Sequence, residues 1–115
     1  MRPDSRLVMT TPNHDSLHHR IGRKLGSNVP YCCAAEHIHE YGFDELISFM
    51  RAHGFEVVRS KGVFAMPYWA LPEHFGCTIQ SITDNDWEVL EWLYEIGRDM
   101  PPRYAFGQLH SFRLA

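Results

Sequence analysis

The feature that most constrains the fold is an amphipathic helix pattern leading directly into a β-type segment, in "YGFDELISFMRAHGFEVVRSKGV". Four apolar residues follow the i, i+3, i+4, i+7 spacing that places side chains on one face of an α-helix. Gly42 is an acceptable N-cap, and Gly54 suits the left-handed residue that follows many helices. A helix joined to a strand by a glycine turn is typical of α/β folds. The four residues of the face are Phe43, Leu46, Ile47 and Met50.

Two further β-type segments and one further helix complete this pattern. The run "RLVMTT" predicts a first strand, and its consecutive apolar residues suit a strand that is covered on both faces. Pro12 then ends the strand. The segment "TDNDWEVLEWLYEIGRDMPP" predicts a helix capped by Thr83, and "RYAFGQLHSFRLA" predicts the last strand. The expected inner face of that helix is Trp87, Leu90, Leu93 and Ile96 or Gly97.

Two segments show no clear periodicity. Residues 16–33 are expected to be loop with some helix, because Gly22 and Gly26 weaken a helix there. The stretch "PYWALPEHFGCTIQS" carries two prolines and several aromatic residues, which suggests an ordered excursion that could act as a lid over an apolar substrate. The order strand, helix, strand, excursion, helix, strand predicts one α/β domain over residues 1–115.

Composition excludes several classes of protein. The 115 residues are 44% hydrophobic, which is enough to bury a core, and the net charge of −3 gives no reason to expect a nucleic-acid partner. No apolar run approaches the roughly 20 residues that span a bilayer, so no membrane partner is expected. The 3 cysteines are odd in number and irregularly spaced, and no signal-peptide pattern is present, so reduced thiols in the cytoplasm are expected.

Three segments in the same order resemble class I S-adenosylmethionine-dependent methyltransferases of the type 11/12-like kind. "MRPDSRLVMTTPN" looks like the segment of the fifth strand, which ends in "TPN" in that family. "EHIHEYGFDELISFMRAHGFEVV" is similar to the next block, in which a histidine and an aromatic residue precede a helix, a "GF" turn and the sixth strand. "DMPPRYAFGQLHSFRLA" is similar to the last block, in which a proline-ended helix leads to the seventh strand.

This resemblance implies a partial Rossmann-like methyltransferase sheet with flanking helices. The three strands would correspond to strands five, six and seven of the family, with the last strand antiparallel between the other two. The chain would then be a single partial domain, the C-terminal half of the fold. The glycine-rich turn and the acidic strand end that bind the family's cofactor have no counterpart in this sequence. The chain alone is therefore expected to bind S-adenosylmethionine negligibly, although the complete enzyme would use it.

The resemblance also implies which residues would face the methyl acceptor. His37 would be the catalytic base, since methyl transfer to oxygen or nitrogen needs a deprotonated acceptor and histidine titrates near neutral pH. Asn13 and His14 would contact a small-molecule methyl acceptor, and Tyr41 would orient or pack against it. The alternative for His37 is a structural, hydrogen-bonded histidine before a helix.

Two other functions remain open. The first strand would be an interior strand of the complete sheet, so its bare edge could pair with a second copy or with an N-terminal half on another chain, as a non-catalytic interaction half-domain. A small metal protein is the third hypothesis, although we assign no residue as a metal ligand. Its donors would come from "CCAAEHIHE", namely Cys32, Cys33, Glu36, His37, His39 and Glu40.

Overall fold

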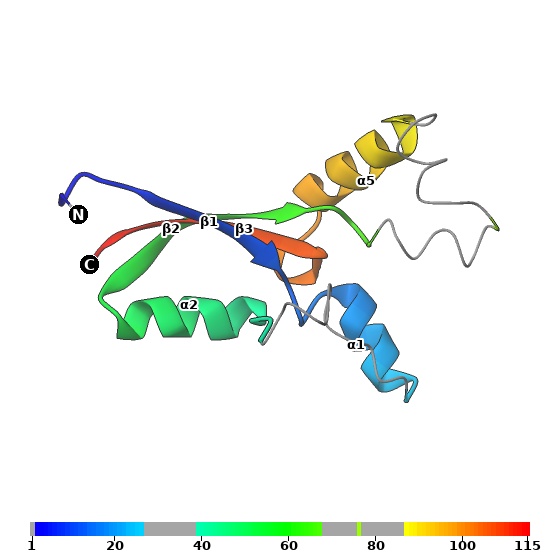
Figure 1. Ribbon diagram of the computed structural model, residues 1–115, viewed down its shortest axis with the longest axis horizontal. Coiled ribbons are helices and arrows are strands. Elements are labelled where there is room, and N and C mark those ends of the chain that lie inside the picture. Colours follow the sequence, from blue (N-terminus) through cyan, green and yellow to red (C-terminus); the bar gives the residue numbers. More distant parts are fainter. Residues whose placement is uncertain (1, 27–38, 68–75, 77–86) are drawn as a thin grey trace.

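The computed structural model describes residues 2–26, 39–67, 76 and 87–115 (Figure 1). Three strands, three helices and one 3₁₀ turn occupy this part of the chain. They are β1 (Leu7–Pro12), α1 (Leu17–Lys24), α2 (Phe43–Ala52), β2 (Phe55–Val63), α5 (Trp87–Asp99), η2 (Pro102–Tyr104) and β3 (Gly107–Leu114).

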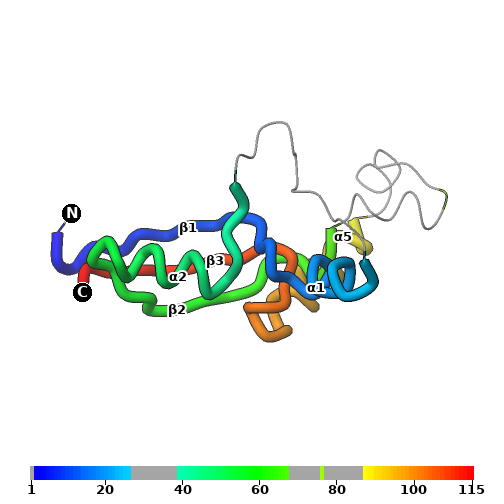
Figure 2. The backbone as a smooth tube through the Cα atoms, turned by 90° about the horizontal axis from the view of Figure 1, so that it is seen from below, coloured from blue at the N-terminus to red at the C-terminus, as the bar shows by residue number. Residues whose placement is uncertain are grey.

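The three strands form one sheet in the order β1-β3-β2, and β3 is antiparallel to both neighbours. Figure 2 shows β3 between the other two strands. The prediction that the last strand lies antiparallel in the middle is confirmed. In the register, Pro12 of β1 and Val63 of β2 both pair with Gly107. The ends of β1 and β2 and the start of β3 therefore meet at one end of the sheet.

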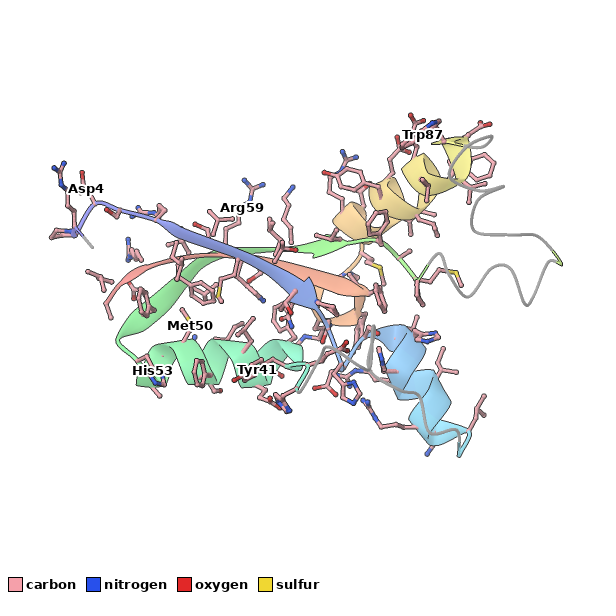
Figure 3. The ribbon with its side chains drawn as sticks, in the orientation of Figure 1. Asp4, Tyr41, Met50, His53, Arg59 and Trp87 are labelled. Carbon is pink, nitrogen blue, oxygen red and sulfur yellow. The ribbon has the colours of Figure 1, made fainter. Side chains whose placement is uncertain are left out.

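Helix α2 covers one face of this sheet (Figure 1). Leu46 and Met50 of α2 and Phe112 of β3 are its buried centre, and Figure 3 shows Met50 between the helix and the sheet. Burying each apolar side chain of this size stabilises the folded state by about 1.5–3 kcal/mol. Partly buried apolar residues surround this centre, and they are Leu7, Met9, Tyr41, Phe55 and Val57.

Within the described part of the chain, strand β1 is covered on one face only, which corrects the expectation of cover on both faces. Leu7 and Met9 pack against the core under α2, whereas Val8 between them is 64% exposed. Successive side chains of a strand point to opposite faces, so a consecutive apolar run still divides between the two. On the face opposite α2, the described helix is α5, and it lies at the far end of the sheet from the chain termini (Figure 1).

Helix α5 contacts β2 through Gly97, which was one of its expected inner residues, but the expectation that Trp87 lies on the same inner face is wrong. Gly97 is buried against the backbone of Phe64, while Trp87 is 66% and Ile96 58% exposed. Leu90 and Leu93 are half-buried, as expected for inner residues. The helix thus approaches the sheet closely at Gly97, whereas Trp87, at the other end of the helix, is exposed to solvent.

Helix α1 replaces part of the segment expected to be mostly loop. Ser16 is its N-cap, and its side chain accepts a hydrogen bond from the backbone N–H of His19. Such a cap contributes about 1 kcal/mol, which helps to offset the unfavourable glycine at position 22. Most of the predicted excursion, and the cap predicted at Thr83, lie outside the described residues. None of the described helices has the length and apolar character needed to cross a membrane.

Candidate metal centre at the end of β1

The candidate site lies where β1 ends and two other segments meet it. The loop of residues 13–16 leads from β1 into α1, and residues 39–42 lead into α2. The backbone N–H of His14 donates to the carbonyl oxygen of Tyr41 at 3.3 Å, which joins these two segments. Figure 3 shows Tyr41 at the start of α2, below the end of β1. Loops at the carboxyl ends of strands are the usual place for ligand sites in α/β folds.

Asn13 anchors the loop that follows β1. Its side chain is fully buried, and its Nδ2 donates to the carbonyl oxygens of Arg103 (2.8 Å) and Ala105 (3.2 Å). Its backbone N–H donates to Phe106 O at 2.8 Å, and its Oδ1 accepts from the N–H of Asp15 at 3.0 Å. All of these contacts are with the protein's own backbone. Asn13 therefore fixes the start of the loop on the segment before β3.

Gln108 of β3 holds the second segment in place. Its Nε2 donates to the carbonyl oxygens of Tyr41 (2.9 Å) and Pro12 (3.3 Å), so one buried amide bridges both segments. Its Oε1 faces Nε2 of His110 at 2.8 Å, and Nδ1 of His110 is hydrogen-bonded to the hydroxyl of Ser60 at 2.7 Å. The acceptor Oε1 places a proton on Nε2 of His110, and burial, which lowers the pKa of His110, favours the neutral form of the ring.

Three side chains converge beside this bridge. His14, His19 and Glu40 each offer a ligand atom, and the three atoms lie within 4.8 Å of one another. His19 is 1% exposed and Glu40 is 2% exposed, whereas His14 is half-buried. Two imidazoles and one carboxylate are a donor set that binds zinc or iron in proteins. We refer to these residues as the His-His-Glu cluster.

The orientation of His19 follows from its place in α1. It is the third residue of the helix, and the hydroxyl of the N-cap Ser16 is hydrogen-bonded to its Nδ1 at 2.9 Å. Its ring stacks on Phe106, with centroids 6.2 Å apart and planes 13° apart, and lies 4.7 Å from the ring of His14. The hydroxyl of the cap residue therefore holds Nδ1 and fixes the orientation of the ring.

Charged groups near the cluster are tied to other partners. Arg23 Nη2 pairs with Asp15 Oδ1 at 2.8 Å, and its Nη1 donates to the carbonyl oxygen of His14 at 2.9 Å. Arg20 donates from Nε to the carbonyl oxygen of Asp15 and lies over the ring of Tyr104. These contacts hold the backbone of residues 14 and 15. Burial lowers the pKa of the neighbouring His18, which favours its neutral form.

The predicted substrate residues Asn13, His14 and Tyr41 come together at this end of the sheet, and their contact with a methyl acceptor stays a prediction. The half-buried ring of Tyr41 packs against Phe49, with centroids 5.4 Å apart. The predicted base, His37, lies outside the described residues, as do Cys32, Cys33 and Glu36. His39 is exposed and paired with Glu45.

Sequence reasoning did not identify His19, although a signal for it exists. Ser16 is a strong N-cap residue, and a polar side chain at the third helical position commonly reaches back to the cap. Placing the start of α1 at Ser16 would have turned His19 back toward the loop that carries His14. The sequence does suggest Glu40 as a possible metal donor, but together with the residues of "CCAAEHIHE" and not with His14 and His19.

The chain matches no family among those whose sequence models were compared with it, and no curated protein shows significant sequence similarity to it.

Proposed function

We propose that this chain forms the C-terminal, acceptor-side part of a class I S-adenosylmethionine-dependent methyltransferase fold. The reaction would transfer a methyl group to an oxygen or nitrogen of a small molecule, in the cytoplasm. In this proposal β1, β2 and β3 correspond to strands five, six and seven of such a sheet. The remaining strands would pair with the free edge of β1.

One observation carries the proposal, namely the strand order with its directions. β1 and β2 run parallel, and β3 lies between them antiparallel to both. Because β1 and β2 are parallel, the chain between them must cross from one end of the sheet to the other. Strands joined by simple hairpins would instead be antiparallel neighbours. The arrangement agrees with the strand order that the resemblance in "TPN", "HEY…EL" and "GF" implies.

The site residues would have distinct tasks in this reaction. Asn13 and Gln108 hold the two loops in fixed positions by their hydrogen bonds to backbone carbonyls. His14 and Tyr41 would line the side where the acceptor binds. His37, a few residues before Tyr41 along the chain, would accept the acceptor's proton as the methyl group is transferred.

The described residues do not fit the family's cofactor site. β1 ends at Pro12 and is followed by Asn13, and none of the described strands is followed by a glycine-rich turn. Backbone N–H groups in such a turn are what allows close approach of a nucleotide cofactor. Cofactor binding is therefore proposed only for an assembly in which other strands complete the sheet, and no reaction step is derived for this chain alone.

Calorimetric titration of S-adenosylmethionine tests the proposal in two arms. The 115-residue chain alone should show no saturable binding. The natural protein, purified from its own cells together with the chains that accompany it, should bind the cofactor and transfer a labelled methyl group to small-molecule acceptors. Substitution of His37 by Gln in that form should abolish transfer while leaving cofactor binding intact. A natural form that binds no cofactor would contradict the proposal.

A second candidate function is an interaction half-domain without catalysis. It is favoured by the exposed position of β1, which lies at the sheet edge and has Val8 64% exposed. An open edge of this kind presents unpaired backbone groups to another strand. Sedimentation equilibrium distinguishes the outcomes for the isolated chain. A dimer that binds no cofactor would favour the interaction function, whereas a monomer would count against self-pairing.

A further inference from the structure

We propose that His14, His19 and Glu40 form a binding site for one divalent transition-metal ion, with Zn²⁺ as the best-matched ion. This inference does not depend on the proposed methyl transfer, because it rests only on the chemistry and position of the three side chains. It also differs from a metal site built on the cysteine-containing segment, with which it shares only Glu40.

The donor set selects the class of ion. Neutral imidazole nitrogens suit zinc, copper, iron and nickel, whereas magnesium and calcium prefer oxygen ligands throughout. Two histidines with one glutamate are a known zinc set, in which three protein ligands leave a fourth position for water. A site of this kind would place a polarised water molecule at the end of β1.

The separations of the three ligand atoms are close to those at a tetrahedral zinc ion. Ligand atoms that lie about 2.0–2.1 Å from a tetrahedral zinc ion are about 3.3 Å from one another. The three atoms of the cluster lie within 4.8 Å of one another, so binding requires them to approach by no more than about 1.5 Å. The ring centroids of His14 and His19 are already 4.7 Å apart.

Burial makes a bound cation favourable. Glu40 is 2% exposed, and the attraction between a carboxylate and a bound cation is stronger in such a buried place than in water. Phe106 covers one side of His19 and contributes an apolar wall. Asp15, the carboxylate nearest along the chain to His14, instead pairs with Arg23 and lies against Gly42. Glu40, by contrast, has a carboxylate oxygen within 4.8 Å of the ligand nitrogens of the two imidazoles.

The hydrogen bond at the other ring nitrogen of His19 matches that of a metal-binding histidine. Such a histidine almost always donates its other ring N–H to a hydrogen-bond acceptor, which fixes the ring and its tautomer. Ser16 Oγ lies 2.9 Å from Nδ1 of His19 and can accept that proton, leaving Nε2 for the metal.

The backbone that carries the ligands is held before any metal binds. The N–H of His14 donates to Tyr41 O, and Gln108 bridges Pro12 and Tyr41, so His14 and Glu40 sit on segments joined by hydrogen bonds. His19 is fixed by its place in the first turn of α1. Less ordering is then required on binding, which favours affinity.

Titration of Zn²⁺ into the chain after removal of metals with a chelator tests this site. One equivalent should bind, and Glu40→Gln or His14→Gln should each weaken the affinity by at least about tenfold. His53→Gln is the matched control, because His53 is exposed at the end of α2 and should leave binding unchanged. Circular dichroism verifies that each variant is folded.

Co²⁺ provides a second measurement that does not need a variant. The site should give the visible absorption of cobalt bound by nitrogen and oxygen, without the near-ultraviolet charge-transfer band of a thiolate ligand. A thiolate band, no saturable binding at one equivalent, or equal affinity of wild type and folded Glu40→Gln would each overturn the proposal. If Glu40→Gln does not fold, His14→Gln and the cobalt spectrum decide it.

Discussion

Gln108 donates a hydrogen bond from Nε2 to the carbonyl oxygen of Tyr41 at 2.9 Å, although the two residues are 67 positions apart in the chain. The same nitrogen reaches Pro12 O, and Oε1 accepts from His110. A fully buried amide thus connects the middle strand, the end of β1 and the segment before α2. Each polar atom of the Gln108 side chain therefore supplies a hydrogen-bond partner to a group that is shielded from water.

Replacing Gln108 by Met should destabilise the protein by about 1–3 kcal/mol, because the shape is kept while several buried polar groups lose their partner. Urea unfolding monitored by circular dichroism measures this loss. The exposed residue Thr10 of β1 provides a control, and Thr10→Ala should stay within about 0.5 kcal/mol of wild type. Equal stability of the two variants would contradict the bridging role of Gln108.

Asn13 should stabilise the protein by donating hydrogen bonds from its side-chain amide. Asn13→Asp should therefore lower the stability more than the small change in side-chain volume suggests. The aspartate keeps the acceptor for the N–H of Asp15 but places a charged oxygen against the carbonyls of Arg103 and Ala105. Loss of the donor with an unpaired buried charge should cost at least about 2–3 kcal/mol at neutral pH. Thermal unfolding measures the effect. A folded variant as stable as wild type would contradict the role of the Asn13 amide in anchoring the loop.

His110 should make stability depend on pH. Burial lowers its pKa in the folded state below the ordinary value of 6.5, so below that pH the unfolded chain binds a proton more readily than the folded chain. This contribution to stability is full above about pH 6.5 and is lost as the pH falls toward the folded pKa. The pKa of His18 is shifted in the same direction and adds to the effect.

The measurement is the urea midpoint at about pH 7.5 and about pH 5.5, with a chelator present so that metal binding does not contribute. His110→Asn should reduce the difference between the two midpoints, even though it lowers both. His53→Gln, at an exposed position, should leave the difference as in wild type. An unchanged pH dependence in His110→Asn would assign the effect to other groups.

Much of the fold was predictable because its local signals are strong. The 3.6-residue spacing in α2, the glycine turn after it and the β-type runs define helices and strands without reference to distant contacts. The central position of β3 came from the resemblance rather than from any local pattern. The exposure of Val8 and Trp87 was mispredicted, because apolar character alone does not reveal which face of an element is covered.

The candidate site was predictable only in part, for a physical reason. His14 and Tyr41 were singled out, and a backbone hydrogen bond joins them. His19 joins the cluster through a helix whose start depends on the Ser16 cap, and glycines at positions 22 and 26 obscured that helix. Glu40 reaches it because the buried amide of Gln108 holds the adjoining residue Tyr41. A contact between positions so distant in sequence leaves no local pattern.

Gly97 tests the close contact between α5 and Phe64, the residue that follows β2. A methyl group added there would lie 2.6 Å from Cα of Phe64, and the obstacle is backbone that cannot rotate away. Within an isolated helix, Gly→Ala is favourable by about 0.5–1 kcal/mol, whereas overpacking a tight contact costs about 1–3 kcal/mol. Gly97→Ala should therefore lower the melting temperature despite its better helix propensity. Glu95→Ala, at an exposed position of α5, is the control and should leave the melting temperature nearly unchanged, so a rise in Gly97→Ala would mean that α5 does not pack closely on β2.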